Sequence, residues 1–239
     1  MRISHVASGL SLAALLLIGT LLAGCSPPPS GPALVLGSAP WQDGEQAVYD
    51  VLDRNGTKIG TSTFSFAREG DLWVLAGHDQ VGQLDQTTTV RIDAGTLKPQ
   101  AGEQVIHAQG TDATLRYTYA NGVLEISAVV NGKSQTVKID VPTNTLDNGQ
   151  LLMTLRAAPF AKSYEARFVN LVPGRALKLN SAVRVKGQET ITVPAGTFEV
   201  WRVELDFVQA KQTAWYQIAA PHQLVQYDNG STRLVLSKE

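Results

Sequence analysis

Residues 114–141, TLRYTYANGVLEISAVVNGKSQTVKIDV, decide the fold class. Two Asn-Gly dipeptides, Asn121-Gly122 and Asn131-Gly132, divide the stretch into three runs in which apolar and polar residues alternate. Asn and Gly both tolerate the positive φ that a two-residue type I′ turn requires, so alternating runs joined by this dipeptide indicate β-hairpins. The stretch therefore predicts a three-stranded antiparallel meander.

The same signals recur outside this stretch. Three more Asn-Gly dipeptides occur, at Asn55, Asn148 and Asn229, and residues 177–186 and 201–207 alternate in the same way. Clean alternation predicts one buried and one wet face, as in antiparallel sheets, whereas parallel strands covered on both sides are continuous apolar runs.

The last hairpin is expected to turn at Asn229-Gly230. Val225 and Tyr227 precede this dipeptide, and Leu234 and Leu236 follow it. We expect these four apolar side chains to face one another on one side of the sheet.

One segment breaks the alternation. Asp147 and Gln150 have the spacing of a capping box, in which Asp147 accepts from the first-turn amides and Gln150 reaches back. The apolar residues that follow at helical spacing, before Pro159, are Leu151, Leu152, Leu155 and Ala158. We predict a short helix from Asn148 to about Ala158 that packs on the dry face of the sheet; the alternative is a long crossover with no helix.

Together these patterns predict a mainly β protein. The expected architecture is a single curved antiparallel sheet, half-barrel-like, over residues 41–239, with one short helix packed on its concave face. With 44% apolar and 17% charged residues in 239, the chain is not of the disordered class. One cysteine excludes a disulfide scaffold, and a net charge of −1 provides no basic excess for nucleic acid.

The first 24 residues have the pattern of a secretory signal. An apolar block runs from Leu10 to Ala23, which is shorter than the roughly 20 residues of a transmembrane helix and suits the core of a signal peptide. Leu22-Ala23-Gly24-Cys25 resembles the lipobox of bacterial lipoproteins, which implies that Cys25 is acylated and becomes the mature N-terminus. The alternative is an ordinary cleavage site beside a free cysteine.

An acylated Cys25 implies a membrane tether. A diacylglyceryl group supplies the two chains that stable anchoring requires. Residues 25–40, rich in Pro, Ser and Gly, are predicted to form a spacer between the membrane and the domain. We expect a cell-envelope location, on the outer face of the cytoplasmic membrane or in an outer membrane.

The sequence shows no catalytic, cofactor or metal pattern. His78, His107 and His222 are widely separated, and the segment from Asp53 to Thr57 fits a hairpin turn better than a calcium loop. Glu204 and Asp206 point the same way from one strand, but Arg202 shares that face, which favours a solvated, charge-mixed surface. We predict no catalytic residues, no metal and no cofactor.

One group of side chains remains as a candidate for binding. Trp73, Trp201, Trp215 and Tyr216 are candidates to line a cavity for an apolar ligand, although such aromatic residues are more often core. The segment from Gln86 to Thr89 is typical of an exposed strand face.

The two ends of the domain resemble a known family. The stretch 193–203, VPAGTFEVWRV, is followed by TAWY at 213–216 and PHQLV at 221–225, and the opening runs from Gly44 to Gly60. These segments are similar to the domain-of-unknown-function family numbered 3108. The resemblance implies an exported envelope protein with a β-rich, half-barrel-like body, and it carries over no catalytic residues.

Three functions remain open from the sequence. The first is a non-enzymatic lipoprotein whose half-barrel binds an apolar ligand or a partner protein. The second is a structural or accessory interaction module with a packed interior, which binds through strand edges or loops. The third is an enzyme that uses dispersed residues. The volume and lining of the cavity discriminate between the three.

Overall fold

The computed structural model describes residues 31–208 and 210–238. Its strands, in chain order, are β1 (Gln46–Leu52), β2 (Lys58–Glu69), β3 (Leu72–Val81), β4 (Leu84–Asp93), β5 (Pro99–Ala108), β6 (Thr111–Ala120), β7 (Val123–Val130), β8 (Lys133–Asp140), β9 (Thr145–Asp147), β10 (Glu165–Val172), β11 (Leu177–Val193), β12 (Gly196–Asp206), β13 (Lys211–Gln217), β14 (Leu224–Asp228) and β15 (Arg233–Leu236). The helical segments are α1 (Leu151–Thr154), followed directly by the 3₁₀ turn η1 (Leu155–Ala157), and a second 3₁₀ turn, η2 (Pro173–Arg175).

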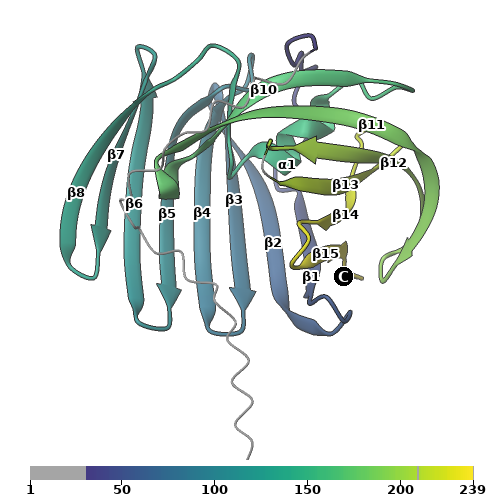
Figure 1. Ribbon diagram of the computed structural model, residues 1–239, viewed down its shortest axis with the longest axis horizontal. Coiled ribbons are helices and arrows are strands. Elements are labelled where there is room, and N and C mark those ends of the chain that lie inside the picture. The colour runs from purple at the N-terminus through teal and green to yellow at the C-terminus, as the bar shows by residue number, and fades with distance from the viewer. Residues whose placement is uncertain (1–30, 209, 239) are drawn as a thin grey trace, which may run out of the picture.

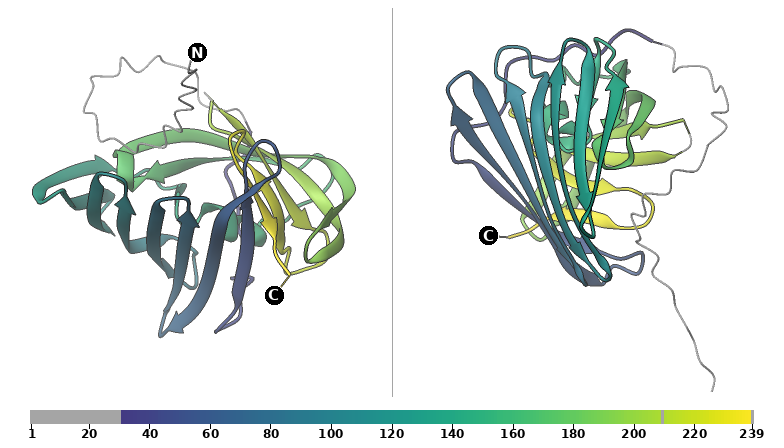
Figure 2. Two further views of the ribbon diagram at one scale, coloured as in Figure 1. Left: turned by 90° about the horizontal axis from the view of Figure 1, so that it is seen from below. Right: turned by 90° about the vertical axis from the view of Figure 1, so that its left-hand side faces the viewer.

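All the strands belong to one open sheet. The order is β8-β7-β6-β5-β4-β3-β2-β1-β15-β14-β13-β12-β11-β10-β9, so β8 and β9 are its two ends. Neighbours pair antiparallel except β9, which runs parallel to β10. The sheet curves until β10 and the start of β11 lie across the concave side of the long strands (Figures 1 and 2). This confirms the predicted curved sheet, with one parallel pair at its end.

The Asn-Gly turns form where the sequence places them in the meander. Asn121 and Gly122 have φ of 52° and 74°, and Asn131 and Gly132 have φ of 46° and 77°. Both residues of each turn therefore adopt the positive φ of a type I′ hairpin. Strands β6, β7 and β8 pair without a register shift, which confirms the meander.

The helix is present but shorter than predicted, and only half of the capping box forms, since Asp147 Oδ1 accepts from the Gly149 amide at 2.7 Å but Gln150 does not reach back. α1 begins at Leu151, and its N-cap residue, Gln150, makes no capping hydrogen bond with its side chain. The Gln150 amide donates instead to the Leu97 carbonyl at 2.9 Å and to Thr154 Oγ1 at 3.1 Å. Because the segment is buried, Gln150 satisfies groups of the surrounding sheet rather than the exposed end of a helix.

The plug, residues 150–160 around α1 and η1, fills the concave side. Its carbonyl groups accept hydrogen bonds from the segment before β1 and from β13, since a short helix leaves them without internal donors. The donors are the Trp41 indole to Met153 at 3.3 Å, the Tyr216 hydroxyl to Leu152 at 2.9 Å and the Gly37 amide to Ala157 at 2.8 Å. The main core is therefore a filled interior.

A buried ion pair fastens the plug to the sheet. The Arg156 side chain is only 1% exposed, and its Nη1 lies 2.6 Å from Glu45 Oε1, just before β1. The guanidinium also donates from Nε to the Pro221 carbonyl at 3.3 Å and stacks over Phe66 at 5.8 Å from the ring centre.

The prediction of one wet face is wrong near the C-terminus. Val193, Val200, Val225 and Val235 form a buried cluster on the outer face, which we call the outer cluster. The tip of the β11–β12 hairpin contacts the end of β15, where the Ala195 amide donates to the Leu236 carbonyl at 3.1 Å. The strongly bent hairpin thus covers part of the outer face.

A β-bulge changes the expected facing of Val225. The register between β13 and β14 shifts between Trp215 and Tyr216, because Tyr216 pairs with Leu224 and Trp215 with Gln226. Val225 is the extra residue and packs in the outer cluster, whereas Tyr227 keeps its predicted partner Leu234. A bulge inserts one residue and reverses the facing on one side of it.

Residues 32–37 pack on the domain. Ala33 bridges to Arg167, and the Leu34 amide donates to the Arg167 carbonyl at 2.8 Å. The second half of the segment predicted as a spacer is therefore held against β10, while residues 1–30, which include the predicted signal and Cys25, lie outside the described residues. Within residues 31–208 and 210–238, no helix has the length and apolar character needed to cross a membrane.

Candidate functional site

The four aromatic candidates do not come together. Trp73 and Tyr216 are buried in the main core, and Trp201 packs against the same core while half-buried. Trp215 lies on the opposite face, beside the outer cluster, where its indole N–H donates to Glu189. The groove and the cleft described below are lined by other residues, so the ligand role of these aromatic residues stays a prediction.

The charged candidates form separate surface pairs. Each of the three histidines has a partner of its own: His78 with Asp85 at 2.9 Å, His107 with Asp112 at 2.8 Å and His222 with the Gln217 carbonyl at 2.9 Å. Asp53 Oδ1 accepts from the amides of Asn55 and Thr57, which closes a hairpin turn. Throughout the described ranges, no group of three or more His, Cys, Asp or Glu side chains is placed to hold a metal ion.

Glu204 and Asp206 point the same way, as the sequence predicts. Both contact Arg184, at 3.5 Å and 2.8 Å respectively. Burial opposes ionisation of Asp206, but hydrogen bonds from Arg184 and the Val208 amide outweigh it and lower the pKa of Asp206. Arg202 pairs with Glu189 instead, at 3.7 Å. The arrangement is an ion-pair network on a surface, as the charge-mixed face predicts.

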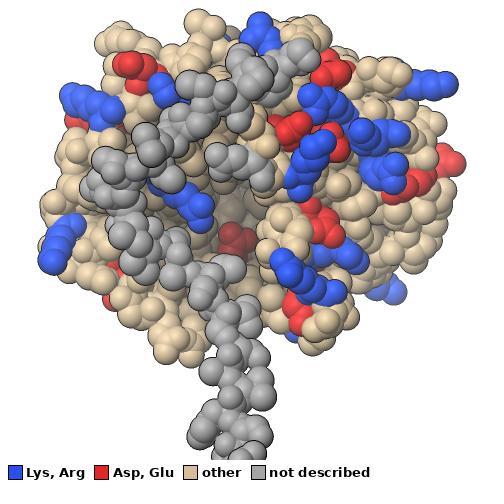
Figure 3. Space-filling model, in the orientation of Figure 1, with Lys and Arg blue, Asp and Glu red and all other residues tan. Residues whose placement is uncertain are grey.

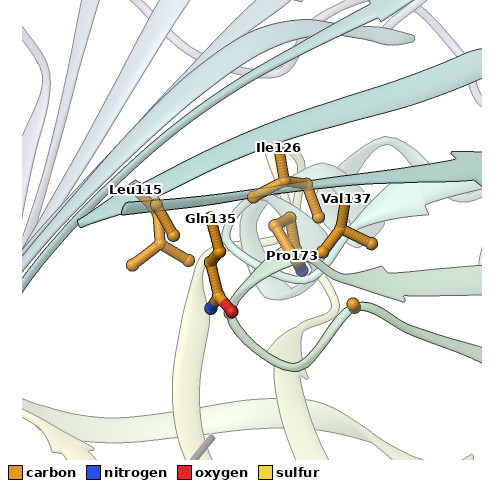
Figure 4. A pocket seen from close by; sticks show the side chains of 8 residues that line it. Leu115, Ile126, Gln135, Val137 and Pro173 are labelled. Carbon is orange, nitrogen blue, oxygen red and sulfur yellow. The ribbon is translucent and has the colours of Figure 1, made fainter. Parts of the chain in front are cut away.

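A small apolar groove lies between the meander and the turn that joins β10 to β11. The side chains of the meander point toward Pro173 of η2 (Figure 4). The groove has room for only about 20 Å³ and is lined by Leu115, Ile126, Ala128, Gln135, Val137, Pro173, Gly174 and Ala176. We refer to this feature as the groove.

A larger cleft of about 280 Å³ opens beside the turn between β4 and β5. Its walls are mostly polar backbone and threonine groups, with Lys98 as the charged residue. The lining residues are Leu34, Leu36, Gly37, Gly95, Thr96, Leu97, Lys98, Thr143, Asn144, Thr145 and Leu146. With Lys98 as its one charged lining residue, this cleft does not indicate a particular class of ligand.

Strand β8 is the free end of the sheet beside the groove. The Val141 amide donates to the Gly122 carbonyl at 2.7 Å, and the register of β7 and β8 has no shift. Backbone groups alternate along an antiparallel strand, so those of Gln135, Val137 and Ile139 face β7. The N–H and C=O groups of four residues therefore point away from the sheet: Ser134, Thr136, Lys138 and Asp140.

The concave face carries a polar area that the plug does not cover. Pairing places Ser62, Asp79 and Gln86 side by side on β2, β3 and β4, and Thr88 beside Gln104 on β4 and β5. We call these five residues the floor. Phe66, Leu75 and Val90 of the same strands belong to the main core, so alternation puts the floor on the concave side. Figure 3 shows a hollow in this face of the molecule.

Asp79 is the charged group of the floor. The Ser62 hydroxyl, which is 1% exposed, donates to Asp79 Oδ1 at 2.5 Å. Burial raises the pKa of Asp79, and the hydrogen bond from Ser62 opposes this effect. Across the described part of the chain, no Lys or Arg nitrogen forms a salt bridge with Asp79. The carboxyl group thus lies half-buried without a cation.

A second buried carboxyl group joins the meander to the plug. Asp147 of β9 is fully buried, accepts from the Tyr119 hydroxyl of β6 at 2.6 Å and accepts from the Gly149 amide at 2.7 Å. Burial raises the pKa of Asp147 to about 6, although both hydrogen bonds lower it. Strands β6 and β9 do not pair, so this contact links two parts of the sheet that the backbone leaves apart.

Sequence patterns did not identify the floor or the β8 edge. Gln86 and Thr88 look like residues of an exposed strand face, yet they are half-buried on the concave side, while Thr87 faces outward. Alternation separates the two faces of a strand but does not say which face is concave. The order of the strands, which decides that β8 is an end, depends on the pairing of β1 with β15 across the whole chain.

Structural comparison supports the fold. A β-barrel-like protein from Brucella abortus, of the domain of unknown function DUF1849, superimposes with a TM-score of 0.50 and 13% identity, over 81% of this chain and 95% of that one. Two others are less similar. A candidate exported protein with a YmcC-like fold from Bacteroides fragilis has a TM-score of 0.30 and 9% identity, over 85% of this chain and 99% of its own. A candidate lipoprotein from Parabacteroides distasonis has a TM-score of 0.31 and 11% identity, over 87% and 99%.

Comparison by sequence gives the family. No curated protein matches the chain. Residues 47–238 match the family described as "Protein of unknown function (DUF3108)", which covers nearly all of the strands. This agrees with the resemblance carried by residues 193–203 and 213–225. The chain therefore belongs to the DUF3108 family.

Proposed function

We propose that this protein is a lipid-anchored, non-enzymatic protein of the cell envelope that binds an extended segment of a partner protein along β8. The observation that carries the proposal is the row of β8 backbone groups, beside the groove, with which no strand of the described residues pairs. An extended segment that adds a strand to a sheet edge gains main-chain hydrogen bonds, and pockets for alternate side chains provide specificity. The groove supplies such a pocket.

The size of the apolar space favours a partner protein over a small apolar ligand. Pockets for small molecules usually measure about 300–1,000 Å³. The groove offers about 20 Å³, enough for the tip of one side chain but not for an acyl chain. The main interior is occupied by the plug, whose residues Leu151, Met153 and Leu155 are at most 3% exposed.

Exposed positive charges on β8, η2 and β11 indicate the charge of the partner segment. Lys133 of β8, Arg175 of η2 and Lys178 of β11 are exposed, and none of the salt bridges within the described ranges includes them. Lys133 begins β8, Arg175 ends η2, and Lys178 is the second residue of β11. The segment that fits has apolar residues at alternate positions facing the groove and acidic residues beside them.

The test uses a defined peptide of eight residues, Glu-Val-Thr-Val-Thr-Val-Thr-Glu, added to the isotope-labelled protein. We expect amide shifts in the NMR spectrum at Ser134, Thr136 and Lys138, whose N–H groups point outward. Thr136→Pro removes one of these donors and is expected to weaken binding at least tenfold, because proline cannot join the new ladder. Thr136→Val keeps the N–H and is the matched control.

Two results would contradict the docking proposal. One is a set of shifts that avoids β8, and the other is equal binding by the Thr136→Pro and Thr136→Val proteins. Native mass spectrometry of the purified protein provides a further check. A lipid-sized molecule that remains bound would instead favour the apolar-ligand function.

Anchoring is tested by Cys25→Ser. The serine hydroxyl cannot form the thioether to lipid, and without two acyl chains the protein has no stable hold on the bilayer. We expect the variant to move from the membrane fraction to the soluble envelope fraction when cells are fractionated. Firm membrane association of the variant would contradict lipidation at Cys25.

A further inference from the structure

We propose that the floor is a carbohydrate-binding site, in which Asp79, Gln86, Thr88 and Gln104 hydrogen-bond the hydroxyl groups of a saccharide chain lying across β3–β5, while the buried Ser62 holds the Asp79 carboxyl group in place. The site is separate from the β8 edge and does not depend on peptide docking. It uses side chains on the concave face, whereas docking at β8 uses the backbone of an end strand.

The pairing of the strands arranges these groups in rows. Asp79 lies directly opposite Gln86 on the next strand, and Thr88 lies directly opposite Gln104. Neighbouring strands are about 4.8 Å apart, so polar side chains in one row follow one another at that spacing. Both rows include β4, so a ligand that passes from the Asp79–Gln86 row to the Thr88–Gln104 row meets hydrogen-bonding groups on β3, β4 and β5.

The chemistry of the floor matches hydroxyl groups. A sugar hydroxyl donates one hydrogen bond and accepts others, and glutamine and threonine side chains do the same. Asp79 supplies a carboxylate acceptor with which no Lys or Arg of the described residues pairs, and hydrogen bonds to a charged acceptor are the stronger kind. The weak contacts within the floor, at 3.4 Å from Gln86 and from Gln104 to Thr88, leave these amide groups able to bind a ligand.

An aromatic ring borders the floor. Gly77 lies beside Asp79 on β3, and the Phe64 ring of β2 covers the position where Gly77 has no side chain. The Phe64 ring lies against Gly77, where an added Cβ would be 3.4 Å from the ring, and the ring stays half-exposed. A half-exposed aromatic ring beside polar groups offers an apolar contact to the C–H face of a sugar. The hollow in Figure 3 lies on this concave face.

Other classes of ligand fit the floor less well. A peptide strand needs unpaired backbone, but β2, β3, β4 and β5 are paired on both sides. A lipid tail needs an apolar surface, and the floor is polar. A metal ion needs several ligating side chains, and Asp79 belongs to no such group among the residues that the structure describes.

The experiment is calorimetric titration of the whole chain, purified in detergent, with the tetramer of β-1,4-linked N-acetylglucosamine. A second titration uses the tetramer of glucosamine, which has the same backbone but carries amines. We expect saturable binding of at least one tetramer. Asp79→Asn, which keeps the shape and removes the charge, is expected to weaken it at least tenfold. Asp85→Asn is the matched control, because Asp85 is exposed on the adjacent strand and faces outward.

Two further measurements keep the test decisive. Gln86→Ala is expected to weaken binding about fivefold, and it serves if Asp79→Asn fails to fold. NMR shifts on adding the tetramer are expected at Ser62, Gly77 and Gln86, whereas shifts at Thr136 would place the ligand at β8 instead. Absence of binding to both tetramers by the wild-type protein, or equal binding by wild type, Asp79→Asn and Gln86→Ala, would overturn the proposal.

Discussion

Glu45→Ala is expected to lower the free energy of unfolding by about 3–5 kcal/mol, because it leaves the Arg156 guanidinium buried without its carboxylate. The Arg156 side chain is 1% exposed, so water cannot replace Glu45 around the charge. The orphaned Nη2 of Arg156 already lacks a hydrogen-bond partner, which adds to the desolvation that Glu45 offsets. The free energy of unfolding of a protein domain is usually about 5–15 kcal/mol, so this loss is a large fraction of the total.

Urea denaturation followed by tryptophan fluorescence measures this effect. Arg156→Met is expected to cost less than Glu45→Ala, because methionine fills the apolar site and Glu45, at 20% exposure, stays partly hydrated. Glu69→Ala is the control, since its pair with Arg91 is exposed and 3.7 Å long, and surface pairs contribute about 0–1 kcal/mol. Equal losses for Glu45→Ala and Glu69→Ala would show that Arg156 is not a buried charge.

Asp147 makes the stability of the protein fall as pH rises from about 4 to about 6. Its pKa is 3.8 in the unfolded chain and about 6 in the folded protein, so the folded state holds the proton more tightly in this window. The stabilisation is fully present below pH 3.8 and is lost as pH rises through about 6. A shift of this size corresponds to about 3 kcal/mol.

Asp147→Asn removes most of this slope. Asp79, whose pKa burial also raises, contributes in the same direction. Tyr119→Phe removes a hydrogen bond that favours the charged form, so it is expected to move the midpoint of the slope to higher pH. Asp112→Asn, on the exposed surface, is the control. Urea denaturation at half-unit steps from pH 4 to pH 7 measures the slope, and an unchanged slope in Asp147→Asn would contradict the assignment.

The meander shows what local sequence determines. Asn121-Gly122 and Asn131-Gly132 fix two turns, and the alternation between them fixes the register, so the pairing of β6, β7 and β8 follows from 28 consecutive residues. No long-range information is needed, because each strand pairs with its sequence neighbour.

Features that depend on distant contacts could not be predicted. The capping-box pattern at Asp147 is a local signal, and the Gly149 amide does donate to Asp147 Oδ1, but the donor to Asp147 Oδ2 is Tyr119, 28 residues earlier. Likewise Gln150 is drawn to the Leu97 carbonyl, 53 residues away. Local hydrogen-bonding patterns fail where burial supplies other donors and acceptors.

The two proposed binding surfaces could not be predicted from the sequence for a related reason. Tryptophan is conspicuous in a sequence, and Trp73 is buried in the core as large aromatic residues usually are. Asp79 and Gln86 belong to no recognisable sequence motif. Cross-strand pairing places them side by side, and the curvature of the sheet puts them on its concave face. A site made of single residues on successive strands leaves no motif.

Amide hydrogen exchange along β8 tests the central claim that this strand is an open edge. The account predicts fast exchange at Ser134, Thr136, Lys138 and Asp140, whose N–H groups point outward, and slow exchange at Gln135, Val137 and Ile139, which bond to β7. Slow exchange at all seven amides in the isolated protein would mean that β8 is already paired on both sides, and would contradict the open sheet and the docking function that depends on it.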